Sequence, residues 1–481
     1  MLLLLPGAAK RPLTLGEGID QAIAASKPLA GASIGIQIVR LADGKVLYER
    51  DADRLLVPAS NTKLFSSALA LTRLGADYRF VTSIRAERPV DGEGALNGDL
   101  IFVGGGDPSM SGRPYPYQKD WPATEELQAI EGLADQLTAG GLRAVHGDIV
   151  GDDSRYPAQP YPDGWSMGDA TWEYGAPVSA LMVNDNTLGV VIEAGGSEGD
   201  PAGVTVTPRF EFLTVENRVR TVAGGEREVH LEGGPGTLEL RAWGTIPLGS
   251  APDGSLVAIP DPALFAAAVL RDALVRRGVK VSGRAVARHR ALDDAAAGEL
   301  GLELARRVSP PLKQLLQVVD KVSQNLHAEA MLREVGAVRR GTGTTAAGIL
   351  ELRDFLTTAG IGPDQYRFTD GSGLSRNTLV SARAIIQLLK YMHGKPGQES
   401  WAGLLPIGNE DGTLRNRFKG HPEAAAIHAK TGSLGHVRAM SGYAASKRYG
   451  ELAFSILVNN YAAPDGEATA LLDKIGLRLI P

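Results

Sequence analysis

Three short groups of residues in this chain of 481 could together carry out nucleophilic acyl transfer. They are Ser60-Asn61-Thr62-Lys63, Ser323-Gln324-Asn325 and Lys430-Thr431-Gly432. A serine hydroxyl attacks a carbonyl carbon when a nearby base takes its proton. Because a Ser-x-x-Lys group alone occurs about once or twice by chance in a chain of this length, the prediction depends on the order of the three groups and on the elements that carry them.

The first group opens a predicted helix that runs from about Ser60 to Leu74 and stops at Gly75. At a helix start, Ser60 lies beside backbone N–H groups that favour negative charge on an attacked carbonyl oxygen. Lys63, one turn later, could take the hydroxyl proton only if burial or a second cation, such as Lys430, lowers its pKa by several units from about 10.4. The alternative is a helix N-cap at Ser60 followed by a solvated Lys63.

The other two groups supply polar side chains that suit a peptide substrate. Ser323 and Asn325 fall between two predicted helices, where a hydroxyl can pass a proton to a leaving amine and an amide can orient the substrate. Lys430 and Thr431 end a predicted strand and could hold a substrate carboxylate, while Gly432 allows close approach and the N–H of Ser433 completes an oxyanion site with that of Ser60. Helix caps and a strand-end turn are the structural alternatives.

The elements that must position these residues come from both ends of the chain. Ile34, Ile36 and Ile38 alternate in a strand, and Asp43-Gly44 predicts a hairpin turn. Three further antiparallel strands are predicted at 426–431, 437–444 and 452–459, followed by a closing helix around 468–475. Helical spacing is found at 312–319, 326–335, 346–358 and 381–391. We therefore predict an α/β (α+β) fold with a five-stranded antiparallel sheet flanked by helices.

The segment between these ends has short β-like runs broken by Gly and Pro, with helical patterns only at 124–138 and 262–277. This predicts inserted, mostly β material. The expected division is a discontinuous catalytic domain at 1–80 and 291–481, an inserted domain at 81–175 and 256–290, and a second, β-rich inserted domain at 176–255.

With the three groups in this order, the chain resembles the low-molecular-mass class C penicillin-binding proteins, which are D-alanyl-D-alanine carboxypeptidases. Four further stretches carry the resemblance, and they are Phe102 to Pro108, Asp370 to Arg376, Asp411 to Leu414 and Ala429 to Leu434. The gap of 263 positions between Ser60 and Ser323 is similar to the large insertion of this class.

The resemblance implies the penicillin-recognising fold and a serine DD-peptidase of peptidoglycan stem peptides. It would act as a carboxypeptidase on the terminal D-alanine, and action as an endopeptidase on D-alanyl cross-links stays open. In it Ser60 is the acylated nucleophile, Lys63 the base, Ser323 and Asn325 the proton relay and substrate clamp, and Lys430 with Thr431 the carboxylate binders. β-Lactams would acylate Ser60 as substrate mimics. Gln324 departs from the Asp that is common at this position, and we expect altered packing behind the site without loss of activity.

Composition excludes several other kinds of site. The chain has no cysteine, so thiolate chemistry and disulfides are excluded, and no metal-ligand spacing or cofactor motif is found. A net charge of -5 without a basic block gives no reason to expect nucleic acid as a partner.

Two further features have structural interpretations. The Gly104 to Asp107 run predicts a tight turn and not a phosphate-binding loop, since no Gly-Lys-Ser/Thr follows it. His428 and His436 are expected to have packing or surface roles, because Lys63 is the nearer base.

The apolar start at residues 1–10 is either the tail of a signal peptide or a frayed terminus, and no stretch reaches the roughly 18 to 20 apolar residues of a membrane span. We expect a periplasmic or cell-envelope location on the basis of the substrate.

Two other functions stay open. A β-lactamase or esterase would release penicilloate quickly, although no Glu-x-x-Leu-Asn stretch supplies a deacylating base. A non-catalytic wall-binding sensor would bind the peptide without cleaving it.

Overall fold

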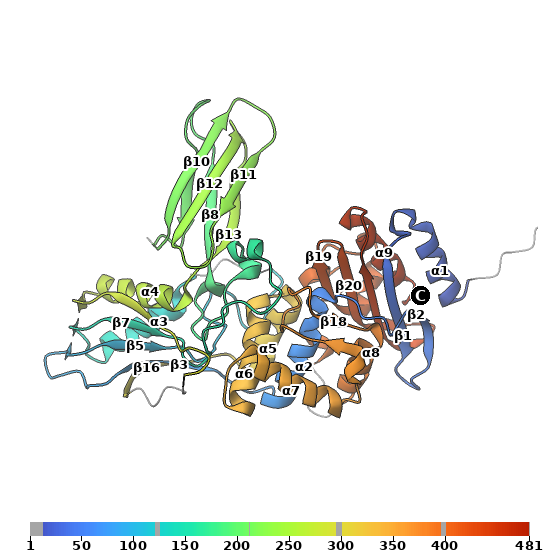
Figure 1. Cartoon of the computed structure of the whole chain (residues 1–481), viewed down its shortest axis with the longest axis horizontal. Coiled ribbons are helices and arrows are strands. Elements are labelled where there is room, and N and C mark those ends of the chain that lie inside the picture. The colour runs from blue at the N-terminus through green and yellow to red at the C-terminus, as the bar shows by residue number, and fades with distance from the viewer. Residues whose placement is uncertain (1–12, 121–125, 211, 295–300, 396–400, 481) are drawn as a thin grey trace, which may run out of the picture. The chain divides into compact units, whose positions relative to one another are not determined.

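The computed structural model describes residues 13–120, 126–210, 212–294, 301–395 and 401–480 (Figure 1). By its internal contacts the chain divides into two units. The first comprises Met1–Asn61, Ala359–Arg367 and Leu379–Pro481, and the second comprises Thr62–Thr358 and Phe368–Thr378. The apolar start at residues 1–10 lies outside the described residues. Of the helices within the described ranges, none is both long and apolar enough for a membrane span.

A five-stranded antiparallel sheet is the centre of the first unit, with the order β19-β20-β21-β1-β2 (Figure 1). Its strands are β1 (Ser33–Arg40), β2 (Val46–Arg50), β19 (Ile427–Leu434), β20 (Val437–Ser446) and β21 (Gly450–Asn459). Each pairs with its neighbour in antiparallel register. The sheet predicted from the two ends of the chain is therefore confirmed.

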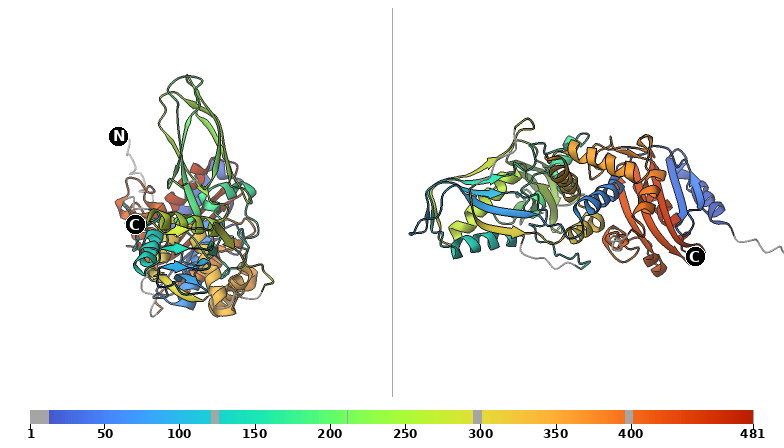
Figure 2. Two further views of the ribbon diagram at one scale, coloured as in Figure 1. Left: turned by 90° about the vertical axis from the view of Figure 1, so that its left-hand side faces the viewer. Right: turned by 90° about the horizontal axis from the view of Figure 1, so that it is seen from below.

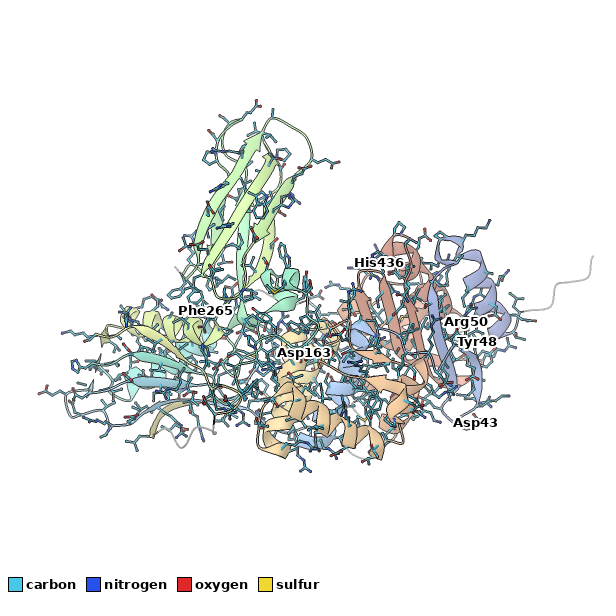
Figure 3. All side chains as sticks on the ribbon, viewed as in Figure 1. Asp43, Tyr48, Arg50, Asp163, Phe265 and His436 are labelled. Atoms are coloured by element: carbon cyan, nitrogen blue, oxygen red, sulfur yellow. The ribbon has the colours of Figure 1, made fainter. Side chains whose placement is uncertain are left out.

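Helices cover this sheet on both faces (Figure 2). Ile34, Ile36 and Ile38 of β1 share a buried core with α1 (Leu15–Ala25) and α9 (Asp465–Leu477), because alternate strand residues point to the same face. On the other face α8 (Ala382–Met392) contacts β1 and β21. Asp43, in the predicted hairpin turn, pairs with Arg40, and Figure 3 labels it together with Tyr48 and Arg50 of β2.

Short elements complete the first unit. They are η1 (Lys27–Leu29), η2 (Ala59–Thr62, which continues into the second unit), η7 (Pro363–Gln365), β17 (Tyr366–Arg367), β18 (Leu379–Val380), η8 (Ala402–Leu404), η9 (Gly412–Leu414) and η10 (Pro422–Ala426). Strands β17 and β18 form a two-stranded ribbon.

Four of the helices in the second unit belong to one group, in which α2 contacts α5, α6 and α7. They are α2 (Lys63–Leu74), α5 (Leu312–Gln317), α6 (Asn325–Arg340) and α7 (Thr345–Thr358), and the π-helical turn η6 (Val318–Val322) follows α5 directly. Gly75, with φ 88°, ends α2 where the sequence predicts a stop.

The rest of the second unit is the inserted, mostly β material that the sequence predicts. A five-stranded sheet has the order β15-β7-β5-β3-β16, and three three-stranded sheets have the orders β14-β6-β4, β13-β8-β9 and β10-β12-β11. The strands are β3 (Val81–Ala86), β4 (Ala95–Leu96), β5 (Leu100–Val103), β6 (Ala144–Val145), β7 (Ile149–Asp152), β8 (Thr187–Glu193), β9 (Gly203–Thr207), β10 (Thr214–Val222), β11 (Glu228–Glu232), β12 (Glu239–Pro247), β13 (Asp253–Ala258), β14 (Lys280–Val281), β15 (Ala285–Arg288) and β16 (Leu302–Val308). The helical elements are α3 (Gln128–Ala139), α4 (Pro262–Arg276), η3 (Met167–Thr171), η4 (Glu173–Gly175) and η5 (Asn184–Asn186).

One apolar core joins these inserted sheets. Phe102 of β5, Val190 of β8, Val219 of β10 and Phe265 of α4, which Figure 3 labels, belong to the same buried cluster. Strand β16 lies after the boundary predicted at residue 290 and pairs with β3. The division into three domains stays a prediction.

Two details of the inserted material show why its sequence was harder to interpret. Strand β12 begins at Glu239 and contains Gly244 at φ 115°, where a side chain would meet the carbonyl oxygen of Glu228, so a glycine interrupts the alternation that marks a strand. At Gly105 an added Cβ would lie 1.8 Å from the carbonyl oxygen of Val81. The glycine run is therefore closely packed, but the turn residues are Pro108 and Ser109, so the tight turn predicted at Gly104 to Asp107 lies just after the run.

Candidate active site

Ser60 and Lys63 lie on a continuous helical segment. Ser60 is in the 3₁₀ turn η2, which runs directly into α2 at Lys63. Thr62 has helical dihedral angles of −53° and −35°, so the chain turns without a break between the two residues. The predicted helix start is thus one turn of 3₁₀ helix followed by α-helix. Ser60 is partly exposed, whereas Lys63 is fully buried.

The Lys63 side chain is held by two hydrogen bonds within the second unit. Its ammonium group donates to Oδ1 of Asn325 at 2.5 Å and to the carbonyl oxygen of Ser372 at 2.8 Å. The first bond joins the first and second sequence groups through two residues that are 262 positions apart. Lys63 is therefore buried and hydrogen-bonded, and not solvated as in the alternative interpretation.

Burial lowers the pKa of Lys63 to about 8. The charged form loses its hydration when the side chain is enclosed, and this loss outweighs the opposing attraction of Asp370, Glu329 and Asp320. From the sequence, either burial or a second cation could lower the pKa of Lys63. In the structure the cause is burial. A fraction of Lys63 is consequently neutral near pH 7 and able to accept a proton.

Asp370 organises the loop that presents the Ser372 carbonyl oxygen to Lys63. Its carboxylate accepts hydrogen bonds from the backbone N–H groups of Gly373 and Ser375 and from the hydroxyls of Ser372 and Thr378, at 2.7–3.2 Å. The indole N–H of Trp165 also donates to it, at 3.2 Å. The carboxylate of Asp370 thus holds the loop together, while Arg376 at its other end is exposed.

Glu329 is a side chain of the candidate site that was not predicted from the sequence. It lies one turn after Asn325 on α6, is fully buried, and accepts hydrogen bonds from the N–H groups of Gly371 and Ser372 at 2.8–3.0 Å. Burial, with the negative charge of Asp370, raises the pKa of Glu329 to about 7. The available signal was a carboxylate at i+4 from Asn325, on the same face of the helix.

The second group forms a strained junction between η6 and α6. Ser323 has φ 69° and ψ 35°, a left-handed conformation that a non-glycine residue adopts at a cost. Gln324 is the helix N-cap, since its Oε1 accepts a hydrogen bond from the N–H of Leu326 at 2.7 Å. The unusual Gln324 therefore has a structural function behind the junction, which agrees with the expected change in packing.

Asn325 uses both ends of its amide within the protein. Oδ1 accepts from Lys63, and Nδ2 donates to the carbonyl oxygen of Tyr174 at 2.7 Å. The structure thus gives Asn325 contact with the base, while its role as a substrate clamp stays a prediction.

The third group lies beside the segment that leads to Ser60, within the first unit. An added Cβ on Gly432 would lie 2.6 Å from the carbonyl oxygen of Pro58 and 3.2 Å from the Cβ of Ala59. Gly432 is therefore needed for the close approach of β19 to the residues just before Ser60. Asn61 strengthens the same region, because its Nδ2 donates to Oγ of Ser441 on β20 at 3.3 Å.

The polar side chains of β19 are also fixed locally. Lys430 is fully buried and its ammonium group donates to the carbonyl oxygen of Thr431 at 2.9 Å. Oγ1 of Thr431 donates to Oγ1 of Thr413 at 2.7 Å, so the Asp411 to Leu414 stretch of the resemblance supports this strand. Ser433 is exposed.

Strand β19 is the edge of its sheet. The N–H of Ala429 points outward, where it donates to the carbonyl oxygen of Pro406 at 2.9 Å. Because backbone directions repeat every two residues in a strand, the N–H groups of Thr431 and Ser433 point to the same side. This is the direction that an oxyanion donor or an added peptide strand requires.

The two histidines near this group bind backbone carbonyl oxygens. Nδ1 of His428 lies 3.3 Å from the oxygen of Ala402, and Nδ1 of His436, labelled in Figure 3, lies 2.9 Å from that of Tyr461. These are packing roles, in agreement with the sequence analysis.

The chain is similar in sequence to known D-alanyl-D-alanine carboxypeptidases. Residues 15–474 match the model of the D-Ala-D-Ala carboxypeptidase 3 (S13) family. A D-alanyl-D-alanine carboxypeptidase from Actinomadura sp. (strain R39) is 34% identical over 97% of this chain and 84% of that protein. The D-alanyl-D-alanine carboxypeptidase DacB from Haemophilus influenzae is 23% identical over 91% of this chain and 88% of that protein.

Solved structures show the same fold. Penicillin-binding protein 4 (DacB) from Haemophilus influenzae matches with a TM-score of 0.83 at 23% identity, covering 95% of this chain and 97% of that one. A second structure of that protein, complexed with a β-lactam, matches with a TM-score of 0.78 at 22% identity, covering 96% of this chain and 98% of that one. The fold class predicted from the sequence is confirmed.

Proposed function

Because the chain belongs to the D-Ala-D-Ala carboxypeptidase 3 (S13) family, we propose that it hydrolyses the terminal D-alanyl-D-alanine bond of peptidoglycan stem peptides through an acyl-enzyme on Ser60. It is thus a hydrolase, a serine-type carboxypeptidase. The observation that carries the assignment of the residues is the buried Lys63, one helical turn from Ser60, with its pKa lowered to about 8.

Acylation begins with proton transfer from the Ser60 hydroxyl to neutral Lys63. The Ser60 oxygen forms a bond to the carbonyl carbon of the penultimate D-alanine, and the carbonyl oxygen becomes negatively charged. The N–H groups of Ser60 and Ser433 stabilise this oxyanion, because charge on it develops as the bond forms. The hydrogen bonds of Lys63 to Asn325 and Ser372 keep its nitrogen in one position.

The leaving group takes a proton as the peptide bond breaks. Ser323 passes the proton held by Lys63 to the amine nitrogen of the terminal D-alanine, which departs as the free amino acid. Water then adds to the ester carbonyl and transfers a proton to Lys63. The bond between the Ser60 oxygen and the carbonyl carbon breaks, and Lys63 returns the proton to the Ser60 oxygen. The products are D-alanine and the shortened peptide.

Residues of β19 would bind the C-terminus of the substrate. The carboxylate of the terminal D-alanine carries a full negative charge, which the ammonium group of Lys430 and the hydroxyl of Thr431 would bind. The outward N–H groups of the edge strand would pair with the extended peptide, as in other complexes formed by strand addition.

β-Lactams should acylate the same serine. A related protein of the same fold has been solved in complex with a β-lactam, and the proposed site contains the nucleophile and base that ring opening requires. For access to this substrate, we propose that the enzyme acts in the periplasm or at the exterior of the cell envelope.

Release of D-alanine from a synthetic peptide ending in D-Ala-D-Ala tests the function. The native chain should release one D-alanine per peptide, and Ser60→Ala should abolish release. Ser67→Ala is the matched control, since the Ser67 hydroxyl is buried on the same helix without a hydrogen-bond partner. Peptide binding without release by the native chain would contradict the proposal and favour the sensor, whereas rapid release of penicilloate from benzylpenicillin would favour the β-lactamase.

A further inference from the structure

The outer face of the β10-β12-β11 sheet has features that the peptidase reaction does not use. Strand β12 is central, and its exposed residue Trp243 lies opposite Arg218 of β10 and His230 of β11 in the registers. Trp243 is 40% exposed, which is high for so large an apolar side chain. The opposite face is buried in the apolar core through Val219 and Leu240.

The indole ring of Trp243 is held in place by its neighbours. The imidazole of His230 stacks against it with ring centroids 5.4 Å apart and an interplanar angle of 24°. A side chain that is fixed before binding loses less conformational entropy when a ligand arrives. Trp243 is therefore a preorganised flat apolar surface.

A connected set of charged groups lies beside the indole. The Glu216 carboxylate accepts a hydrogen bond from Nε of Arg218 at 2.8 Å and forms an ion pair with Nε of Arg241 at 3.1 Å. Each guanidinium has five N–H donors, so both retain donors for a ligand. With Trp243 and Glu232, these three side chains line a depression of about 490 Å³, a size in the usual range of roughly 300–1,000 Å³ for ligand sites.

The balance of charge on this face restricts the ligand. Its residues include four glutamates and three arginines, and these are Glu216, Glu228, Glu232, Glu239, Arg218, Arg220 and Arg241. The formal charge is therefore -1 with His230 neutral. A polyanion such as nucleic acid or an anionic lipid surface requires a positive excess, which this face lacks.

The small apolar area also argues against a protein partner. A stable protein interface buries about 800 Å² per partner around an apolar centre, whereas Trp243 is the one large exposed apolar side chain among the residues of this face. A neutral polar ligand with one apolar surface fits better. A sugar ring has this character, because its C–H groups can stack on the partly negative face of an aromatic ring while its hydroxyls bind guanidinium and carboxylate groups.

We propose that the outer face of the β10-β12-β11 sheet binds a neutral polysaccharide strand, with Trp243 stacking on a sugar ring and Arg218, Arg241 and Glu216 binding its polar substituents. An N-acetylated sugar adds an amide carbonyl that the arginines can bind. The identity of the polymer as the glycan strand that carries the stem peptides follows from the proposed function, whereas the binding itself does not depend on it.

Calorimetric titration with a soluble N-acetylchitooligosaccharide tests the proposal. The native chain should bind, Trp243→Ala should weaken binding about tenfold or more, and Trp243→Phe should keep part of the affinity. Arg241→Gln gives a second measure if Trp243→Ala folds poorly. Leu256→Ala, which changes an exposed apolar residue of β13 in a different sheet, is the matched control and should bind as the native chain does.

Activity measurements separate this proposal from the proposed function. Trp243→Ala should release D-alanine from a small soluble peptide at the native rate but more slowly from insoluble peptidoglycan. No binding of the oligosaccharide by the native chain, or equal binding by Trp243→Ala, would overturn the glycan site whatever the peptidase activity. Self-association or capture of a protein through Trp243 without sugar binding would overturn it as well.

Discussion

Lys63 must be neutral before it can accept the proton of Ser60, and its surroundings favour the neutral form. Its pKa lies near 8 in the folded protein because burial removes the hydration of the ammonium group. In water the same side chain would hold its proton at pH 7 in all but a very small fraction of molecules. At the scale of single residues, burial of Lys63 is therefore what suits it to the role of base that we propose.

The rate of acylation should depend on pH through this residue. Lys63 loses its proton as pH rises through about 8, so kcat/KM should increase about tenfold per pH unit below this value and level off above it. A series of kcat/KM values for D-alanine release across this range measures the effect. An inflection near the ordinary lysine value of about 10.4 would contradict the account.

Glu329→Gln should move that inflection to lower pH. The negative charge of Glu329 raises the pKa of Lys63, in opposition to burial, so removal of the charge should make Lys63 lose its proton more easily. The same pH series on the variant measures the shift. An unchanged or higher inflection would show that Glu329 has only a structural role.

Only some of the residues in the candidate site could be predicted from the sequence. Ser60, Lys63 and Asn325 were found because their spacing follows a known pattern. Glu329 was missed although it follows Asn325 by one helical turn, because its effect on Lys63 depends on burial and on the fold of the Asp370 loop, which a sequence pattern does not contain.

At the scale of elements, Gly432 determines how closely β19 approaches the chain before Ser60. Gly432→Ala would place a Cβ 2.6 Å from the carbonyl oxygen of Pro58, so one of the two segments has to move. Since small displacements of reacting groups are costly, acylation by benzylpenicillin should slow by about 10- to 100-fold. Gly31→Ala, where an added Cβ has no neighbour within 4 Å, should keep the native rate.

The junction before α6 offers a test of stability. Gln324 caps α6 through Leu326, and Gln324→Ala should lower the free energy of unfolding by about 1 kcal/mol. Gln324→Asp should keep the stability, because aspartate is a strong N-cap residue. Denaturant unfolding measures both, and equal loss in the two variants would mean that the cap is not what Gln324 contributes.

The elements of the catalytic sheet were predictable because alternation in the strands at both ends of the chain is regular. The 3₁₀ turn at Ser60 and the π-helical turn before Ser323 were not predicted, since both depend on contacts rather than on periodicity. They lie at the groups with proposed chemistry, where local irregularity is common.

At the scale of the whole molecule, the inserted material shares one apolar core. Val219 of β10 and Phe265 of α4 belong to the same buried cluster, although they lie in different predicted domains. Val219→Ala and Phe265→Ala should therefore lower the temperature of one common unfolding transition in calorimetry, the second variant by more because it removes a larger side chain. Two separate transitions, each sensitive to one variant, would support independent domains instead.

The central claim is that Ser60 is the nucleophile. Mass spectrometry of the intact protein after incubation with benzylpenicillin, followed by mapping of the modified peptide, tests this most directly. We expect one long-lived penicilloyl group per chain, attached to Ser60. An adduct on another residue, or none on the folded native protein, would contradict it.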